Sequence, residues 1–258
     1  MYLYLDNDTW VHRLHPLVRV AGMVAVFITA FSVSRPEWLL PLVLGLVALL
    51  AGTGSLVNVR RLRVLFTLVF ISTLLIWTLF YGPDGQAPLF SWGPILISHT
   101  APRFGLAMAL KLVTFLGGGI LFLSVTRIEE FAYALTRLGV PYKLGFTMTM
   151  AFRLVPVFVD SAGAVVQAQR CRGLDFERGT LWQRVRRYVP VMVPVFMSAL
   201  RRADQMAMAL EARGFQSDRR RTLLDRHPVR ATDVLASALL GAVVLAYLWL
   251  WHSGALAV

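Results

Sequence analysis

The sequence predicts an all-α membrane protein, and three observations lead to this prediction. Apolar residues make up 57% of the 258 residues and charged residues 16%, whereas a soluble globular domain has about 45–50% and about 25%. The mean hydropathy is +0.63. Five apolar runs approach the roughly 20 residues that a helix needs to cross a bilayer. This composition excludes a disordered chain, a coiled-coil rod and an ordinary cytosolic enzyme.

The apolar runs predict four transmembrane helices before residue 126 and one near the end of the chain. They cover residues 17–33, 38–52, 64–80, 104–125 and 231–251. The second run is short and needs flanking residues or a locally thinner bilayer to span it. Gly117, Gly118 and Gly119 lie inside the fourth run, where we expect close helix packing or a bend.

Two basic residues fall within the apolar runs. Arg19 lies near the start of the first run, and we expect its side chain to extend to the membrane surface. Lys111 lies about two turns inside the fourth run. For Lys111, a side chain that reaches the surface and a partner on a neighbouring helix are equally good interpretations.

The distribution of charge predicts the orientation. Lys and Arg total 26 against 14 Asp and Glu, a net charge of +12, and residues 126–230 hold 18 of the former and 9 of the latter. Positively charged loops remain in the cytoplasm, so we expect residues 126–230 and the N-terminus to be cytoplasmic. The loop 81–103 and the C-terminus are then outside. Nucleic-acid binding is the weaker explanation of this charge.

The residue pattern of 126–230 predicts one short helix and two long helices rather than a polar soluble domain. The helices cover residues 128–138, 142–172 and 181–213, and a glycine follows each. An alternative places residues 144–159 and 188–200 in the membrane, but both are short. We favour three parts: an N-terminal membrane domain (1–125), a cytoplasmic coupling segment (126–230) and a C-terminal span (231–258).

Both long helices are amphipathic, with apolar or small residues repeating at spacings of three and four. In the first helix these are Ala151, Leu154, Phe158, Ser161, Val165 and Ala168. In the second they are Val189, Met192, Phe196, Ala199, Ala203, Met206 and Leu210. Such stripes pack helix against helix, and their small members allow two helices to cross closely.

Each long helix ends in a small residue, an arginine and a glycine. The two triplets are Cys171-Arg172-Gly173 and Ala212-Arg213-Gly214. A glycine just past a helix terminates it, which places the arginine at a projecting tip where its planar guanidinium can bind carboxylates or backbone carbonyls. A single end of this kind is explained by helix stability alone, because an arginine in the last turn interacts favourably with the helix dipole. Two of them, closing a pair of amphipathic helices, indicate docking points.

With these features the chain resembles the transmembrane coupling subunit, or T component, of energy-coupling factor (ECF) transporters. The resemblance covers nearly the whole chain: the N-terminal stretch His12-Arg13-Leu14-His15-Pro16, the two triplets and a final span. The second triplet has the Ala-Arg-Gly pattern of the family. The first departs from it, since Cys171 stands where alanine is usual.

The resemblance implies a non-catalytic subunit in a bacterial or archaeal plasma membrane that binds no cofactor or metal. Two ABC ATPase subunits would bind ATP and dock on the tips. The docking residues would be Arg172 and Arg213, in a setting of Cys171, Gly173, Ala212 and Gly214. The motion would pass to a separate substrate-binding membrane subunit, the S component, for uptake of a vitamin or of a cobalt or nickel ion. The other partners are membrane lipids, and no nucleic acid is expected.

Other functions have little support in the sequence. The chain has no Gly-x-x-x-x-Gly-Lys-Ser/Thr loop for ATP, no His-Glu-x-x-His and no Gly-x-Ser-x-Gly motif. His12 and His15 could meet a metal, but we expect a polar pair at the membrane surface. A self-contained permease or channel is the main alternative; it requires several ionisable residues within the membrane, where Lys111 stands nearly alone. A membrane enzyme is the third hypothesis.

Overall fold

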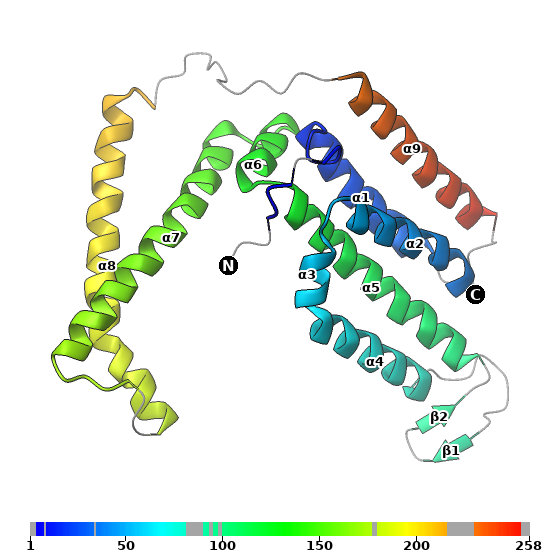
Figure 1. Cartoon of the computed structure of the whole chain (residues 1–258), viewed down its shortest axis with the longest axis horizontal. Coiled ribbons are helices and arrows are strands. Elements are labelled where there is room, and N and C mark those ends of the chain that lie inside the picture. Colours follow the sequence, from blue (N-terminus) through cyan, green and yellow to red (C-terminus); the bar gives the residue numbers. More distant parts are fainter. Residues whose placement is uncertain are drawn as a thin grey trace. The chain divides into compact units, whose positions relative to one another are not determined.

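Figure 1 shows the computed structural model of the chain. The structure describes residues 4–7, 9–33, 35–80, 90–92, 95–97, 100–176, 180–215 and 230–253. The helices of this part are α1 (Pro16–Ser32), α2 (Pro36–Gly52), α3 (Leu56–Arg61), α4 (Arg63–Phe80), α5 (Ala101–Val125), α6 (Ile128–Arg137), α7 (Tyr142–Cys171), α8 (Leu181–Ala212) and α9 (Ala231–His252). Strands β1 (Phe90–Trp92) and β2 (Ile95–Ile97) pair antiparallel.

The predicted all-α fold class is confirmed, and each predicted helix is present with ends within three residues of those expected. The predicted glycine stops are also confirmed: Gly139, Gly173 and Gly214 have φ values of 102°, 86° and 68°. Glycine adopts this left-handed conformation without the steric cost that a Cβ imposes. The short helix α3 and the hairpin of β1 and β2 were not predicted.

Among the helices that the structure describes, four (α4, α5, α7 and α9) are long and apolar enough to cross a membrane. Helices α1 and α2 are apolar but shorter, at 17 residues each. The protein is therefore a multi-pass membrane protein. The five-span interpretation places α7 in the cytoplasm, although its length and composition would also allow it to span.

Contacts between residues divide the chain into two compact units. The first contains residues 1–139 and 227–258, and the second contains residues 140–226. Helix α6 thus packs with the membrane helices, while α7 and α8 form the second unit.

Helix α5 is the centre of the first unit, where it packs against α1, α2 and α4. A Cβ added to Gly117 would lie 2.9 Å from Leu46 Cδ2, and one added to Gly118 would lie 3.1 Å from Val26 Cγ1. Close packing is therefore the role of these two glycines. Helix α5 runs through them without a break.

Helix α9 closes the first unit against α1 and α2. It packs along α1, and the hydroxyl of Tyr247 donates to the carbonyl of Trp38 at 3.2 Å. Tyr247 and Leu250 also pack on a buried cluster of Val33, Leu39 and Ala107.

The two basic residues of the apolar runs have protein partners. The prediction that Arg19 extends to the surface is wrong, because the residue is 8% exposed and its guanidinium binds the ends of neighbouring helices. For Lys111, the interpretation with a partner on a neighbouring helix is confirmed. Its Nζ donates to the carbonyl of Phe31 at 3.0 Å, in the last turn of α1.

In the second unit, α7 and α8 form an antiparallel pair. The ring of Phe215, just after α8, lies 4.6 Å from that of Phe146 and 6.4 Å from that of Tyr142, near the start of α7. At the other end, the ring of Phe176, after α7, lies 5.0 Å from that of Tyr188 in α8. Each helix therefore ends beside the beginning of the other.

The predicted contact stripe is confirmed for much of α7 and only partly for α8. In α7 the partly buried members are Leu154, Phe158, Ser161 and Val165, while Ala151 and Ala168 are exposed. In α8 they are Ala199, Met206 and Leu210. The prediction is wrong for Val189, Met192, Phe196 and Ala203, which are exposed. Val191 is buried and Val195 partly buried instead, so the covered sector of α8 lies beside the predicted one.

Candidate functional site

The first tip is the C-terminal end of α7. Arg172 caps the helix with φ −81° and ψ 6°, and Gly173 follows in the left-handed conformation. The N–H of Gly173 donates to the carbonyl of Arg170 at 2.9 Å, and that of Leu174 donates to Gln169 at 3.0 Å. This pair of bonds is the Schellman motif, which satisfies carbonyls that a helix end otherwise leaves free.

The second tip, at the end of α8, repeats this geometry. Arg213 caps the helix with φ −87° and ψ 6°. The N–H of Gly214 donates to Glu211 at 2.9 Å, and that of Phe215 donates to Leu210 at 2.9 Å. The two triplets therefore form the same local structure, with an arginine at the cap and a left-handed glycine after it.

Both tips are open to a partner. All six residues of the two triplets are exposed. A Cβ placed on Gly173 or on Gly214 would meet no heavy atom within 4 Å. Small residues on either side of each arginine keep the tip narrow, so a guanidinium with five donors can enter a groove and bind carboxylate or carbonyl oxygens.

The surroundings of the two tips differ. A shallow pocket of about 350 Å³ beside the first tip is lined by Arg170, Gly173, Leu174, Asp175 and Phe176. The second tip is backed by the aromatic contact of Phe215 with Phe146.

The antiparallel pairing places the tips at opposite ends of the second unit. Helix α7 has 30 residues, which corresponds to about 45 Å at 1.5 Å per residue. Two partners, or two separate surfaces of one partner, could therefore bind the tips at the same time (Figure 1).

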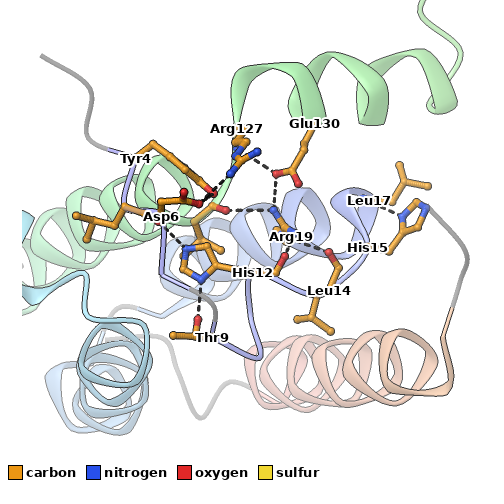
Figure 2. Close-up of polar contacts among 12 residues, drawn as sticks. Tyr4, Asp6, Thr9, His12, Leu14, His15, Leu17, Arg19, Arg127 and Glu130 are labelled. Atoms are coloured by element: carbon orange, nitrogen blue, oxygen red, sulfur yellow. Dashed lines mark hydrogen bonds and ion pairs between the residues drawn. The ribbon is translucent and has the colours of Figure 1, made fainter. Parts of the chain in front are cut away.

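The two N-terminal histidines bind neighbouring protein groups. In the ring of His12, Nδ1 lies 2.6 Å from Thr9 Oγ1 and Nε2 lies 3.0 Å from the carbonyl oxygen of Leu5 (Figure 2). His15 Nδ1 accepts from the N–H of Leu17 at the start of α1. Within the described ranges, no group of three or more His, Cys, Asp or Glu residues could hold a metal ion.

Sequence reasoning missed a cluster of charged residues around these histidines. Arg19 pairs with Glu130 at 2.6 Å, and Arg127 pairs with Asp6 at 2.8 Å. On the side of α9, Asp233 accepts from the N–H of His15 at 2.8 Å. The available signal was a charged residue near the start of an apolar run, which both Arg19 and Asp233 show.

A family model described as "CbiQ: Cobalt transport protein" matches residues 7–224 of the chain. The match includes α1 to α8 and both tips. The chain belongs to the CbiQ family.

Curated relatives of this CbiQ-family chain extend the match. The energy-coupling factor transporter transmembrane protein EcfT of Clostridium kluyveri is 30% identical over 244 residues, which cover 91% of this chain and 90% of that protein. The EcfT of Thermosediminibacter oceani is 28% identical and covers 95% of this chain and 97% of that protein. The chain is thus a T component, the transmembrane component of an ECF transporter.

One relative of the CbiQ-family chain has a different organisation. A putative ABC transporter ATP-binding protein of Bifidobacterium longum is 31% identical over 240 residues. The matched segment covers 88% of this chain but 30% of that longer protein.

Proposed function

We propose that this T component transmits ATP-driven motion from two ABC ATPase subunits to a separate substrate-binding membrane subunit. The observation that carries the proposal is the repetition of one local structure, an exposed arginine cap before a left-handed glycine, at opposite ends of the pair α7 and α8. A pair of helices with such ends can bind two partners and act as a lever between them.

The docking step follows from the chemistry of the tips. Arg172 and Arg213 would each enter a groove of an ATPase and bind carboxylate or backbone carbonyl oxygens there. Cys171, Gly173, Ala212 and Gly214 would leave room for the walls of the groove. The long Bifidobacterium longum protein supports an ATP-binding partner, since a segment similar to this chain occurs in a protein with that name.

The other proposed features concern the substrate and the orientation. The substrate, a vitamin or a cobalt or nickel ion, would bind to the S component rather than to this chain. The chain itself would hydrolyse no ATP, so the purified protein in lipid nanodiscs should release no phosphate from ATP. Residues 126–230 and the N-terminus would lie in the cytoplasm and the C-terminus outside, because the excess of basic residues lies in 126–230.

Substitution of both tip arginines tests the docking role. We expect Arg172→Ala combined with Arg213→Ala to abolish co-purification of the ATPases while the chain still inserts into the membrane. The matched control is Arg153→Ala combined with Arg202→Ala, which removes one exposed arginine from each of the same helices away from the tips. Full ATPase binding by the tip variant, or equal loss in the control, would refute the proposal.

A further inference from the structure

Arg19 is the centre of a buried polar cluster that the docking tips do not use. Its side chain is 5% exposed, and Nη1 lies 2.6 Å from Glu130 Oε2. Nη1 also donates to the carbonyl of Val125 at 3.1 Å, and Nε donates to Leu14 at 3.0 Å. Nη2 donates to the carbonyl of His12 (Figure 2).

This cluster joins four segments of the first unit. His12 and Leu14 precede α1, Arg19 lies in the first turns of α1, Val125 ends α5, and Glu130 lies in the first turn of α6. Because the donors of a guanidinium are fixed in one plane, a single side chain sets the relative positions of these segments.

Glu130 connects the cluster to α6 in two ways. Its Oε2 accepts from Arg19 and also from the backbone N–H of Arg127 at 3.1 Å, which caps the helix. A carboxylate in the first turn also interacts favourably with the helix dipole. The same oxygen therefore stabilises the start of α6 and binds it to α1.

Helix α6 is a short element that also packs on α1, where the ring of Tyr133 lies 6.1 Å from that of His15. It has 10 residues, a length at which an isolated helix is marginal in water. Ala132 and Ala134 are buried, and the ring of Phe131 lies 5.5 Å from that of Phe122 in α5. Along the chain, α6 is the last helix of the first unit before the second unit begins at residue 140. Any force carried by the backbone from α7 must pass through α6.

We propose that the Arg19–Glu130 pair is a clamp that holds α6 to the membrane helices and so carries the motion of α7 and α8 into the first unit. Both are positioning residues for energy coupling, and this role rests on the proposed function above. When the clamp is broken, α6 moves with α7 and the displacement is lost before it reaches α1 and α5.

The clamp itself is tested by hydrogen exchange of the full chain in lipid nanodiscs, read by mass spectrometry. Glu130→Gln keeps an oxygen that can cap α6 but removes the charge that faces Arg19. We expect the amides of residues 131–137 to exchange about tenfold or more faster, while those of α5 and α9 are unchanged. Glu129→Gln is the matched control, since Glu129 is the exposed neighbour in the same turn, and it should behave as the wild type.

A second variant keeps the test decisive if Glu130→Gln does not fold. Arg19→Lys retains the positive charge but not the planar set of donors, so we expect a smaller acceleration that is again confined to α6. Wild-type exchange of residues 131–137 in every one of these variants that folds, or an equal effect of Glu129→Gln, would overturn the clamp.

The coupling role is tested on the chain co-purified with its ATPases, with and without ATP and vanadate. In the wild type we expect nucleotide to change exchange in residues 142–150 and also in residues 120–127. In Glu130→Gln the change at 142–150 should remain, while that at 120–127 falls at least about threefold. An equal change at 120–127 in both proteins would overturn the coupling role. No change at 142–150 in the wild type would contradict the proposed function instead, and the exchange of the isolated chain would still report on the clamp.

Discussion

Arg172 and Arg213 occupy equivalent positions, each as the cap of a long helix, with φ values of −81° and −87° and the same ψ of 6°. Their helices run antiparallel, so the two guanidinium groups lie at opposite ends of one compact unit. The local structures are the same while their surroundings differ, and the contribution of each tip can therefore be measured separately.

Single substitutions should each weaken but not abolish ATPase binding. We expect Arg172→Ala and Arg213→Ala each to reduce the affinity about tenfold or more, since a lost charge-assisted contact is worth about 1.5–3 kcal/mol. Lysine at either position should recover only part of this, because an ammonium cannot form the bidentate contact. Titration of the ATPases onto the chain in nanodiscs measures the affinities. Wild-type affinity of both single variants would contradict two-point docking.

The glycines after the arginines should be as important as the charges. Gly173→Ala and Gly214→Ala place a Cβ on backbone with φ of 86° and 68°, which costs about 1–2 kcal/mol. The last turn should then loosen and the arginine change direction, so ATPase binding falls several-fold. The matched control is Gly163→Ala in the middle of α7, where a Cβ meets no heavy atom within 4 Å. Equal binding by all three variants would show that the caps do not orient the tips.

The sequence predicted the helices and the tips because their signals are local. Apolar runs, amphipathic spacing and glycines such as Gly173 and Gly214 each act within a few residues of the structure they determine. The partners of Arg19 could not be predicted in this way, since Glu130 lies 111 residues further along the chain. A charged residue near the start of a span is equally compatible with the surface and with a buried pair, and only tertiary structure decides between them.

The predicted contact stripe on α8 was partly wrong for a related reason. Periodicity shows which sector of a helix is apolar but not what covers it. In α8, Val191 is buried and Val195 partly buried, whereas Met192 and Phe196 have exposed fractions of 67% and 64%. The apolar sector is therefore broader than one helix–helix contact requires.

The tight packing of α4 on α5 should be sensitive to a single methyl group. A Cβ on Gly105 would lie 2.7 Å from Thr78 Oγ1 and 3.1 Å from the backbone carbonyl of Leu74. Gly105→Ala should therefore destabilise the protein by about 1–3 kcal/mol and lower the melting temperature measured by fluorescence-detected gel filtration. Gly119→Ala, in the same helix with no heavy atom within 4 Å of its Cβ, should not lower it. An unchanged melting temperature for Gly105→Ala would contradict the close α4–α5 contact.

The exposed apolar sector of α8 gives a prediction about the proposed S component. If a membrane subunit covers this sector, a carboxylate at position 196 would lose its contact with water, which costs free energy. Phe196→Glu should therefore reduce co-purification of the S component about tenfold or more, while the ATPases remain bound. Ser198→Glu is the control, because residue 198 is exposed and lies about 200° around the helix from residue 196. Loss of the ATPases with Phe196→Glu, or equal loss of the S component in both variants, would contradict binding of the S component at this sector.

The chain's single cysteine allows the location of the first tip to be tested without any substitution. Cys171 is exposed and is the neighbour of Arg172. If residues 126–230 are cytoplasmic, a membrane-impermeant maleimide should label Cys171 in inside-out vesicles and leave it unlabelled in intact spheroplasts. If instead α7 crosses the membrane, as its 30 apolar-rich residues would allow, the labelling pattern is reversed, because Cys171 lies at the end of α7 opposite to α6. The reversed pattern would place Arg172 outside, beyond the reach of any cytoplasmic ATPase, and would contradict both the orientation and the docking role of this tip.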